Sequence, residues 1–430
     1  MSADLDIALP NSWAWLPIKF ATTFLNRGTA PDYIDDGPVR VISQAANQAF
    51  GLDWQRTRFH DYDGDPRKLK GYLFPNDIII NSTGTGTLGR VGYFTSGPDE
   101  LPCVADGHVT VARADRQVAE PRYMYYWLSC TPFYDFIYSS LTVGATNQIE
   151  LNRERLAGAP IALPPLDEQR RIADFLDAET AGTDLLVDAI GKRLSLLEAR
   201  RRALLMSVFP DFDCVKNRLG YHLNLVTSGP RGWGDYVGPY GSPFFRSANL
   251  RRNGIEPNLE TLALVGPPTS AAAEAARSRI RAGDVLIGIT GANTAWVSLA
   301  DQRIDGANVS QHVCLARPGK TIDGRWLAYA LSAPQIQELL LGSQYGGTKI
   351  QLSLGDIRNL IIPLPSVKDQ QIIAARISDG LANISAEQEI RDRQLALLTE
   401  RRQALITAAV TGQIDVTTAR GFVPAGGASV

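Results

Sequence analysis

The sequence has few of the features that mark membrane, secreted or metal-binding proteins. No apolar run in its 430 residues approaches the roughly 20 that a membrane-spanning helix needs. The segment before Pro10 contains no Lys or Arg, so it does not have the basic start of a signal peptide. The four cysteines form no C-x-x-C pair, and we predict neither a metal site nor a disulfide framework. We therefore expect a cytoplasmic protein that has no membrane partner.

Catalytic motifs are also missing. The chain has neither the Asn/Asp-Pro-Pro-aromatic motif of DNA methyltransferases nor the Asp/Glu-x-Lys pattern with which nucleases hold a metal. A phosphate-binding loop ending at Lys320 fails at Cys314, where its first Gly would stand. The G-x-G-x-x-G pattern starting at Gly84 precedes a strand-like run, so we interpret it as a turn rather than a nucleotide site. His108 and His312 stand at matching places beside strand-like runs, and we expect each to be a structural histidine within its sheet. No catalytic residue is predicted.

The net charge of −2 argues against a protein that coats nucleic acid without specificity, because such proteins carry an excess of Lys and Arg. It leaves room for a local basic surface, and residues 213–360 contain slightly more basic than acidic side chains. Composition alone does not indicate DNA binding.

The sequence does contain an internal repeat with a step of 201 residues. Its clearest part is a helix start, where residues 162–172 match residues 363–373. Gly28 matches Gly229 at the same step, and the strand-like run 108–113 matches 312–317 with looser spacing. Because the matches keep their order, we interpret the chain as globule, helix, globule, helix.

The repeat predicts an α+β fold class, with two similar mixed α/β globular domains related by pseudo-twofold symmetry and each followed by a long helix. Short β-branched runs bounded by Gly, Pro, Asn and Asp predict a twisted antiparallel sheet in each domain. One amphipathic helix per domain is expected near residues 123–129 and 326–332. The predicted segments are the domains 13–158 and 212–360, the helical spacers 159–211 and 361–416, and a disordered tail, 417–430.

Each spacer begins with Pro and acidic residues, as helix N-termini do, and Ser366 with Asp369 resembles a capping box. Gly182 and Gly380 predict a short helix or kink before a longer helix of about 25 residues. Along that longer part, apolar residues and one Arg recur at steps of three and four. This seam packs either on its own domain or on the other helix; we favour an antiparallel coiled coil, which buries two matching seams symmetrically. The seam residues are Leu194, Leu197, Arg201, Leu204, Val208, Leu395, Leu398, Arg402, Leu405 and Ala409.

Polar residues in turns of both domains are the candidates for contacts with a binding partner, with ordinary turn chemistry as the equally weighted alternative. In the first domain they are Gln44, Asn47, Thr83, Thr85, Thr87, Arg90, Thr146, Asn147 and Gln148. In the second domain they are Arg246, Asn249, Arg251, Arg252, Thr290, Asn293, Thr294, Thr348 and Lys349.

The tandem layout resembles the specificity subunit of type I restriction–modification systems over residues 13–416. The helix starts, of the form [LP]-P-x-x-x-[DE]-Q-x-x-I, and the Leu-Leu-x-x-Arg-Arg-x-Ala-Leu ends carry the resemblance; Ser366, Val367 and Asp369 depart slightly from the first copy. The resemblance implies two target recognition domains that each read half of a split sequence in double-stranded DNA. It therefore makes the polar turn residues named above the candidates for binding DNA. It also implies helices that set the gap and dock two methyltransferase (modification) subunits.

The resemblance further implies that restriction/translocase subunits join the complex. S-adenosylmethionine, ATP and Mg would then be bound by those other subunits and not by this chain. Gln169, Arg170, Gln370 and Gln371, at the helix starts, are candidate contacts with partners, against a solvated helix face. The alternative function is a stand-alone two-headed DNA-binding regulator or scaffold, which predicts tight specific binding by the isolated chain and no methyltransferase gene alongside.

Overall fold

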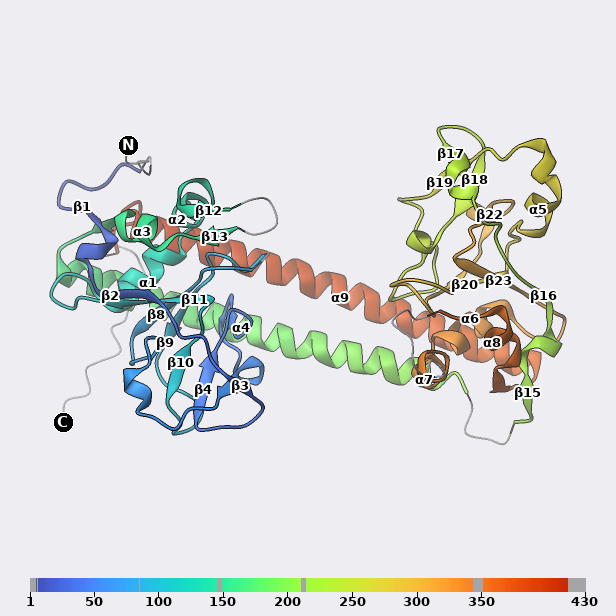
Figure 1. The fold of residues 1–430 in the computed structure, drawn as a ribbon, viewed down its shortest axis with the longest axis horizontal. Coiled ribbons are helices and arrows are strands. Elements are labelled where there is room, and N and C mark those ends of the chain that lie inside the picture. The colour runs from blue at the N-terminus through green and yellow to red at the C-terminus, as the bar shows by residue number, and fades with distance from the viewer. Residues whose placement is uncertain are drawn as a thin grey trace. The chain divides into compact units, whose positions relative to one another are not determined.

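The computed structural model describes residues 5, 7–84, 86–144, 149–209, 214–342 and 351–416. The chain divides into two compact units (Figure 1). Unit 1 comprises Met1–Ile190 and Arg393–Val430, and unit 2 comprises Gly191–Asp392. Each unit therefore contains one globular domain together with part of both long helices.

Unit 1 contains two four-stranded sheets. The antiparallel sheet has the order β2 (Thr22–Arg27), β11 (Val109–Ala114), β8 (Asp77–Asn81), β9 (Val91–Phe94). The other has the order β10 (Cys103–Ala105), β4 (Val39–Ile42), β7 (Arg58–His60), β3 (Tyr33–Ile34), and its β10–β4 pair is parallel.

Unit 2 repeats this topology. Its antiparallel sheet has the order β16 (Leu223–Ser228), β23 (Val313–Pro318), β20 (Val285–Gly288), β21 (Val297–Leu299). Its second sheet has the order β22 (Asn308–Val309), β18 (Ser242–Phe245), β19 (Ala263–Val265), β17 (Val237–Gly238), again with one parallel pair, β18–β22. The predicted antiparallel sheets are confirmed, whereas the mixed sheets were not predicted.

Shorter elements complete each unit. The predicted amphipathic helices are present as α1, which packs on β9, and α6, which packs on β21. The short helices are α1 (Pro121–Ser129), α2 (Thr131–Phe136), α3 (Arg153–Gly158), α5 (Ala272–Arg277), α6 (Gly324–Ser332), α7 (Pro334–Gly342) and α8 (Leu354–Asn359). The remaining strand pairs are β1 (Ala14–Pro17) with β14 (Pro160–Leu163), β15 (Lys216–Arg218) with β24 (Ile361–Pro363), β5 (Asn47–Gln48) with β6 (Gly51–Leu52), and β12 (Thr142–Val143) with β13 (Glu150–Leu151).

The same buried ion pair joins the central strands of both antiparallel sheets. Asp77 accepts hydrogen bonds from Arg113 through both carboxylate oxygens at 2.7 Å, and Asp284 does the same with Arg317 at 2.8 and 2.7 Å. Each carboxylate also accepts a backbone N–H three residues upstream, at 2.8 Å and 2.7 Å. The pair therefore fixes the start of β8 and β20 against the neighbouring strand.

The matched glycines mark a close approach of two backbone segments. A Cβ atom at Gly28 would lie 2.0 Å from the carbonyl oxygen of Ala105, and one at Gly229 would lie 1.8 Å from that of Val309. Both positions therefore exclude any side chain, which explains why glycine recurs in the repeat.

The long helices are α4 (Leu166–Met206, 41 residues) and α9 (Val367–Val410, 44 residues). Both helices continue through Gly182 and Gly380, so the predicted separate short helix is absent, and both helices are longer than predicted. A Cβ atom at Gly380 would lie 2.6 Å from Leu204 Cδ2, so this glycine serves close packing rather than helix termination. Tertiary packing outweighs the roughly 1 kcal/mol that glycine costs within a helix.

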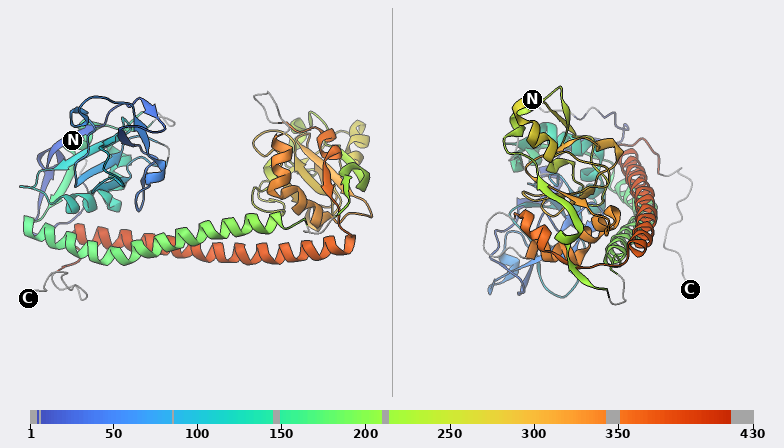
Figure 2. Two further views of the ribbon diagram at one scale, coloured as in Figure 1. Left: turned by 90° about the horizontal axis from the view of Figure 1, so that it is seen from below. Right: turned by 90° about the vertical axis from the view of Figure 1, so that its right-hand side faces the viewer.

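Within each unit the parts of α4 and α9 lie side by side and run in opposite directions (Figure 2). In unit 2, Arg193 pairs with Glu387 at 2.7 Å, whereas Ser207, farther along α4's direction, meets Arg376, nearer the start of α9. In unit 1, Arg402 pairs with Asp184 at 2.8 Å. The predicted antiparallel pairing of the helices is confirmed in both units.

The predicted seam residues are all buried or half-buried. In unit 2, the seam residue Leu204 packs on α9 beside Gly380. In unit 1, the guanidinium of the seam residue Arg402 lies 5.9 Å from the ring of Phe50, which belongs to the globular domain. The seam therefore contacts both the other helix and the domain of its unit, which combines the two alternatives. Val208 belongs to the seam but lies two residues beyond the end of α4.

Candidate nucleic-acid interface

Two polar loops of unit 1 converge at one surface. The loop after β4 carries Gln44, whose side-chain oxygen accepts a hydrogen bond from Thr83 at 2.9 Å. Arg90, in the turn between β8 and β9, donates to the carbonyl oxygen of Asn47 at 3.0 Å. The turn itself needs the left-handed backbone of Gly84, Gly86 and Gly89 and leads into a strand, so its interpretation as a turn is confirmed.

Unit 2 brings together the equivalent loops. Asn293, in the turn between β20 and β21, donates to the carbonyl oxygen of Ser247 at 2.8 Å, as Asn81 donates to that of Gln44 at 3.1 Å in unit 1. Arg251 and Arg252 are exposed at the end of the loop that follows β18. In both domains the loop that follows a strand of the mixed sheet is thus hydrogen-bonded to the end of β8 or to the turn after β20 in the antiparallel sheet.

A threonine–histidine pair lies at this surface in both domains. Thr83 Oγ1 lies 2.9 Å from His108 Nδ1, and Thr290 Oγ1 lies 2.6 Å from His312 Nδ1. Both histidines are exposed, not enclosed in the sheet as predicted. Asp106 fixes the turn before His108 by accepting its backbone N–H at 2.8 Å, and burial raises the pKa of this carboxyl. The recurrence of His in the repeat was the signal that could have placed these residues at the interface.

Several candidate residues hold the loops together from inside. Asn47 and Asn249 are fully buried; Asn47 donates to Asn81 at 3.0 Å, and Asn249 donates to the carbonyl oxygen of Asn258 at 2.8 Å. Thr294 is also buried and donates to the carbonyl oxygen of Gly291 at 2.7 Å. The prediction that these three side chains contact DNA is therefore corrected to a structural role.

The other candidates are accessible to different degrees. Thr87 and Arg246 are half-buried, and Arg246 donates to the carbonyl oxygen of Thr261 at 3.0 Å. Six candidates lie outside the described residues, as does the predicted tail, 417–430: Thr85, Thr146, Asn147, Gln148, Thr348 and Lys349.

The recurring glutamines at the helix starts clamp the domains to the helices. Gln169 accepts the backbone N–H of Glu120 at 2.8 Å and donates to two carbonyl oxygens. Gln370 makes the same set of bonds, accepting the N–H of Asp323 at 2.7 Å. Both side chains are buried, so the prediction that they contact partners is wrong. Their neighbours are exposed: Arg170, which pairs with Asp167 at 2.9 Å, and Gln371.

The predicted capping of α9 is present in a modified form. Ser366 Oγ accepts the backbone N–H of Asp369 at 3.2 Å and donates to the carboxylate of Asp369 at 2.6 Å. The Ser366 side chain thus satisfies one of the free N–H groups at this helix end.

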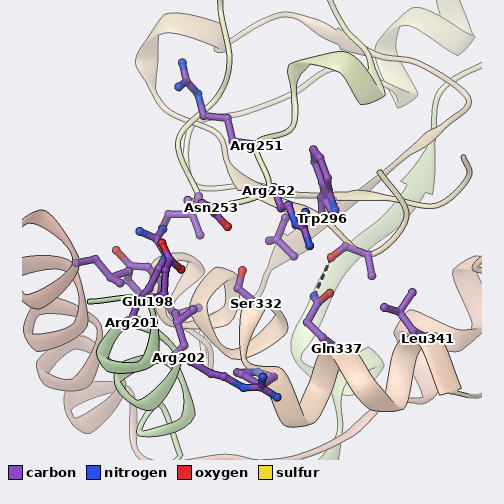
Figure 3. Close-up of a pocket in the computed structure, with 18 of the residues that line it drawn as sticks. Glu198, Arg201, Arg202, Arg251, Arg252, Asn253, Trp296, Ser332, Gln337 and Leu341 are labelled. Carbon is purple, nitrogen blue, oxygen red and sulfur yellow. Dashed lines mark hydrogen bonds between the residues drawn. The ribbon is translucent and has the colours of Figure 1, made fainter. Parts of the chain in front are cut away.

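A cavity of about 430 Å³ lies within unit 2, between the last turns of α4 and the candidate DNA-binding loops (Figure 3). Arg201 and Arg202 line it from α4, and Arg251 and Arg252 line it from the loop that follows β18. Trp296 also lines the cavity. In the second domain it stands at the position that Arg90 has in the first domain. The sequence did not single out Trp296, because the two turns differ in length and the repeat does not align them directly.

Among the described residues, no group of three or more His, Cys, Asp or Glu could hold a metal ion. In the same part of the chain, no helix is long and apolar enough to cross a membrane.

The paired globular domains, the antiparallel helices and the two polar loop surfaces define a tandem DNA-recognition protein. The sequence matches the family described as "Type I restriction modification DNA specificity domain" over residues 41–193 and 272–393. The chain belongs to this family and is a DNA specificity subunit of a type I restriction–modification system.

Individual relatives agree with this assignment. The chain is 23% identical over 429 residues to the type I restriction enzyme EcoBI specificity subunit of Escherichia coli, covering 89% of this chain and 87% of that protein. It is 22% identical over 365 residues to the putative type I restriction enzyme MjaX specificity subunit of Methanocaldococcus jannaschii, covering 80% of each. A chain in a solved structure of the type I R-M system shares its fold, with a TM-score of 0.63, 20% identity and coverage of 95% of this chain and 100% of that one.

Proposed function

We propose that each globular domain reads one half of a split, asymmetric DNA target and that the chain has no catalytic site of its own. Methylation with S-adenosylmethionine and cleavage with ATP and Mg are then carried out by other subunits. Two methyltransferase subunits and the restriction/translocase subunits dock on this chain, for which exposed residues at the helix starts, Arg170 and Gln371, remain the candidates.

One observation carries the proposal: the two domains have the same frame but present different side chains at matched places. Gln44 in the first domain corresponds to Ser247 in the second, because each stands two residues after the end of a matched strand. The last residues of these strands, Ile42 and Phe245, accept the backbone N–H groups of Asp106 and Ser310. Arg90 corresponds to Trp296, because the residue before each closes the turn with an equivalent backbone hydrogen bond. Gly89 donates to the carbonyl oxygen of Asn81, and Ala295 donates to that of Gly288, each at 2.8 Å. Arg favours guanine and phosphate, whereas Trp does not offer a bidentate contact, so the two surfaces should prefer different sequences.

Methylation sequencing of genomic DNA tests this. Cells that express the modification genes with and without this chain are compared by single-molecule sequencing. We expect a split adenine-methylated motif only when the chain is present. Replacing residues 13–158 with the corresponding domain of a relative should change one half of the motif and leave the other half and the gap intact.

Two outcomes would contradict the proposal. Methylation that does not depend on the chain, although the modification subunits are expressed and folded, would favour a stand-alone DNA-binding regulator. A domain replacement that changes both halves of the motif would show that the domains do not read independently.

A further inference from the structure

The cavity in unit 2 is strongly basic. Four arginines line it, and Glu198 is the acidic residue among its lining residues. The carboxylate of Glu198 accepts a hydrogen bond from Gln388 at 2.6 Å, and Arg202 lies 3.6 Å from Glu338 in an exposed pair. The lining therefore carries an excess of positive charge that the described residues do not neutralise.

Arg201 is the unusual member of this set. Its side chain is buried, with the residue 8% exposed, yet it makes no hydrogen bond or ion pair with any residue that the structure describes. Its counterpart in the repeat, Arg402, is equally buried, at 9%, but donates to Asp184 at 2.8 Å. The residue that corresponds to Asp184 is Ser385, which has no charge. Unit 2 thus keeps the buried cation, Arg201 of α4, but has the uncharged Ser385 of α9 where unit 1 has its counterion.

A buried cation without a partner destabilises the protein that carries it, and neighbouring like charges add to the cost. Apolar lining residues such as Ile255 and Leu381 lower the local dielectric, which strengthens the attraction for an anion that enters. The arrangement is therefore unfavourable in the free chain and favourable once an anion is bound.

We propose that this cavity binds a backbone phosphate of the target DNA, beside the half-site that the second domain reads. This inference rests on the proposed function. The cavity borders the loop of Arg251 and Arg252 and the turn of Thr294, so a strand lying on these loops brings its phosphates to the opening. Guanidinium groups match phosphate oxygens through paired hydrogen bonds. Arg201 is then a phosphate-binding residue, not a member of the helix seam alone.

Replacing Arg201 with Gln separates this role from a structural one. In the full chain with its modification subunits, R201Q should weaken binding to a duplex carrying the mapped motif by roughly tenfold or more. The slope of log K against log salt should become less negative by about 0.9, since one fewer counterion is released. The melting temperature of the free chain should stay the same or rise, because an unpaired buried charge has been removed.

R402Q is the matched control. It removes the partner of Asp184 in unit 1, so it should lower the melting temperature and leave the salt slope unchanged. R252Q is a second test, at an exposed residue of the lining, and its result does not depend on whether the protein tolerates a substitution at the buried Arg201. It should also make the slope of log K against log salt less negative. A duplex series with a single neutral methylphosphonate should contain one position at which R201Q causes no further loss of affinity.

An unchanged salt slope and affinity in R201Q would overturn the proposal. If R201Q instead weakens association of the modification subunits while DNA binding stays the same, the cavity binds an acidic protein side chain. Failure of the wild-type complex to bind its motif would contradict the proposed function itself. That outcome is distinguished from failure of this inference because it is seen with the wild type, before any variant is compared.

Discussion

Replacing Arg317 with methionine is expected to lower the free energy of unfolding of unit 2 by about 3–5 kcal/mol. The side chain of Asp284 is only 2% exposed and accepts two hydrogen bonds from its counterion, Arg317, besides one from a backbone N–H. Methionine retains much of the volume but leaves the carboxylate buried without a counterion. The loss should therefore exceed that of any surface ion pair.

Hydrogen exchange of the backbone amides in β20 measures this effect in the intact chain, because it reports the stability of unit 2 separately. R303M is the control: it removes an exposed pair with Asp301 and should cost less than about 1 kcal/mol. The double variant D284N/R317M should recover most of the loss, since no unpaired charge remains. If R317M is as mild as R303M, the buried pair does not hold the sheet.

The sequence predicted the antiparallel sheets well because most of their strands are runs of four to six residues, rich in β-branched side chains and bounded by turn residues. The second sheet escaped prediction for physical reasons. Its strands, such as β10 and β22, span only two or three residues, and their parallel partners are distant in sequence. Such strands are held by tertiary contacts rather than by local preference.

The helix interruptions were wrong for a related reason. A helix propensity penalty is a local quantity, whereas Gly380 lies where the side chain of Leu204 occupies the space that a Cβ atom would need. The sequence shows a helix-breaking residue, and only the paired helices show why it is accommodated.

The candidate interface shows what an internal repeat can and cannot reveal. Recurrence correctly located the loops, but it did not distinguish a residue that supports a loop from one that the loop presents. Asn47, Asn249, Gln169 and Gln370 all recur or occupy matched loops, and all are buried. The residues that distinguish the two domains are expected where the copies differ. A comparison of the two halves by sequence alone leaves these positions unaligned.

Two adjacent glutamines at the start of α9 differ in just this way: Gln370 is buried and Gln371 is exposed. Gln370→Leu is expected to lower the free energy of unfolding of unit 2 by about 2–4 kcal/mol, because buried polar groups left unpaired cost about 1–3 kcal/mol each. The replacement removes the acceptor for the N–H of Asp323 and the donor to the carbonyl oxygens of Thr321 and Pro365. These bonds tie the loop before α6 to the first turn of α9.

Gln371→Leu is the matched control, with the same change one residue later on an exposed position. Its effect on the free energy of unfolding should stay within about 0.5 kcal/mol. Denaturant unfolding followed by hydrogen exchange, together with pull-down of the modification subunits, gives both readouts for each variant. A Gln370→Leu chain that unfolds like the wild type but loses its modification subunits would mean that Gln370 contacts a partner after all. Loss of stability in Gln370→Leu alone would instead establish that this glutamine fastens the second domain to α9. Loss of the modification subunits in Gln371→Leu alone would place a partner contact at the exposed residue beside it.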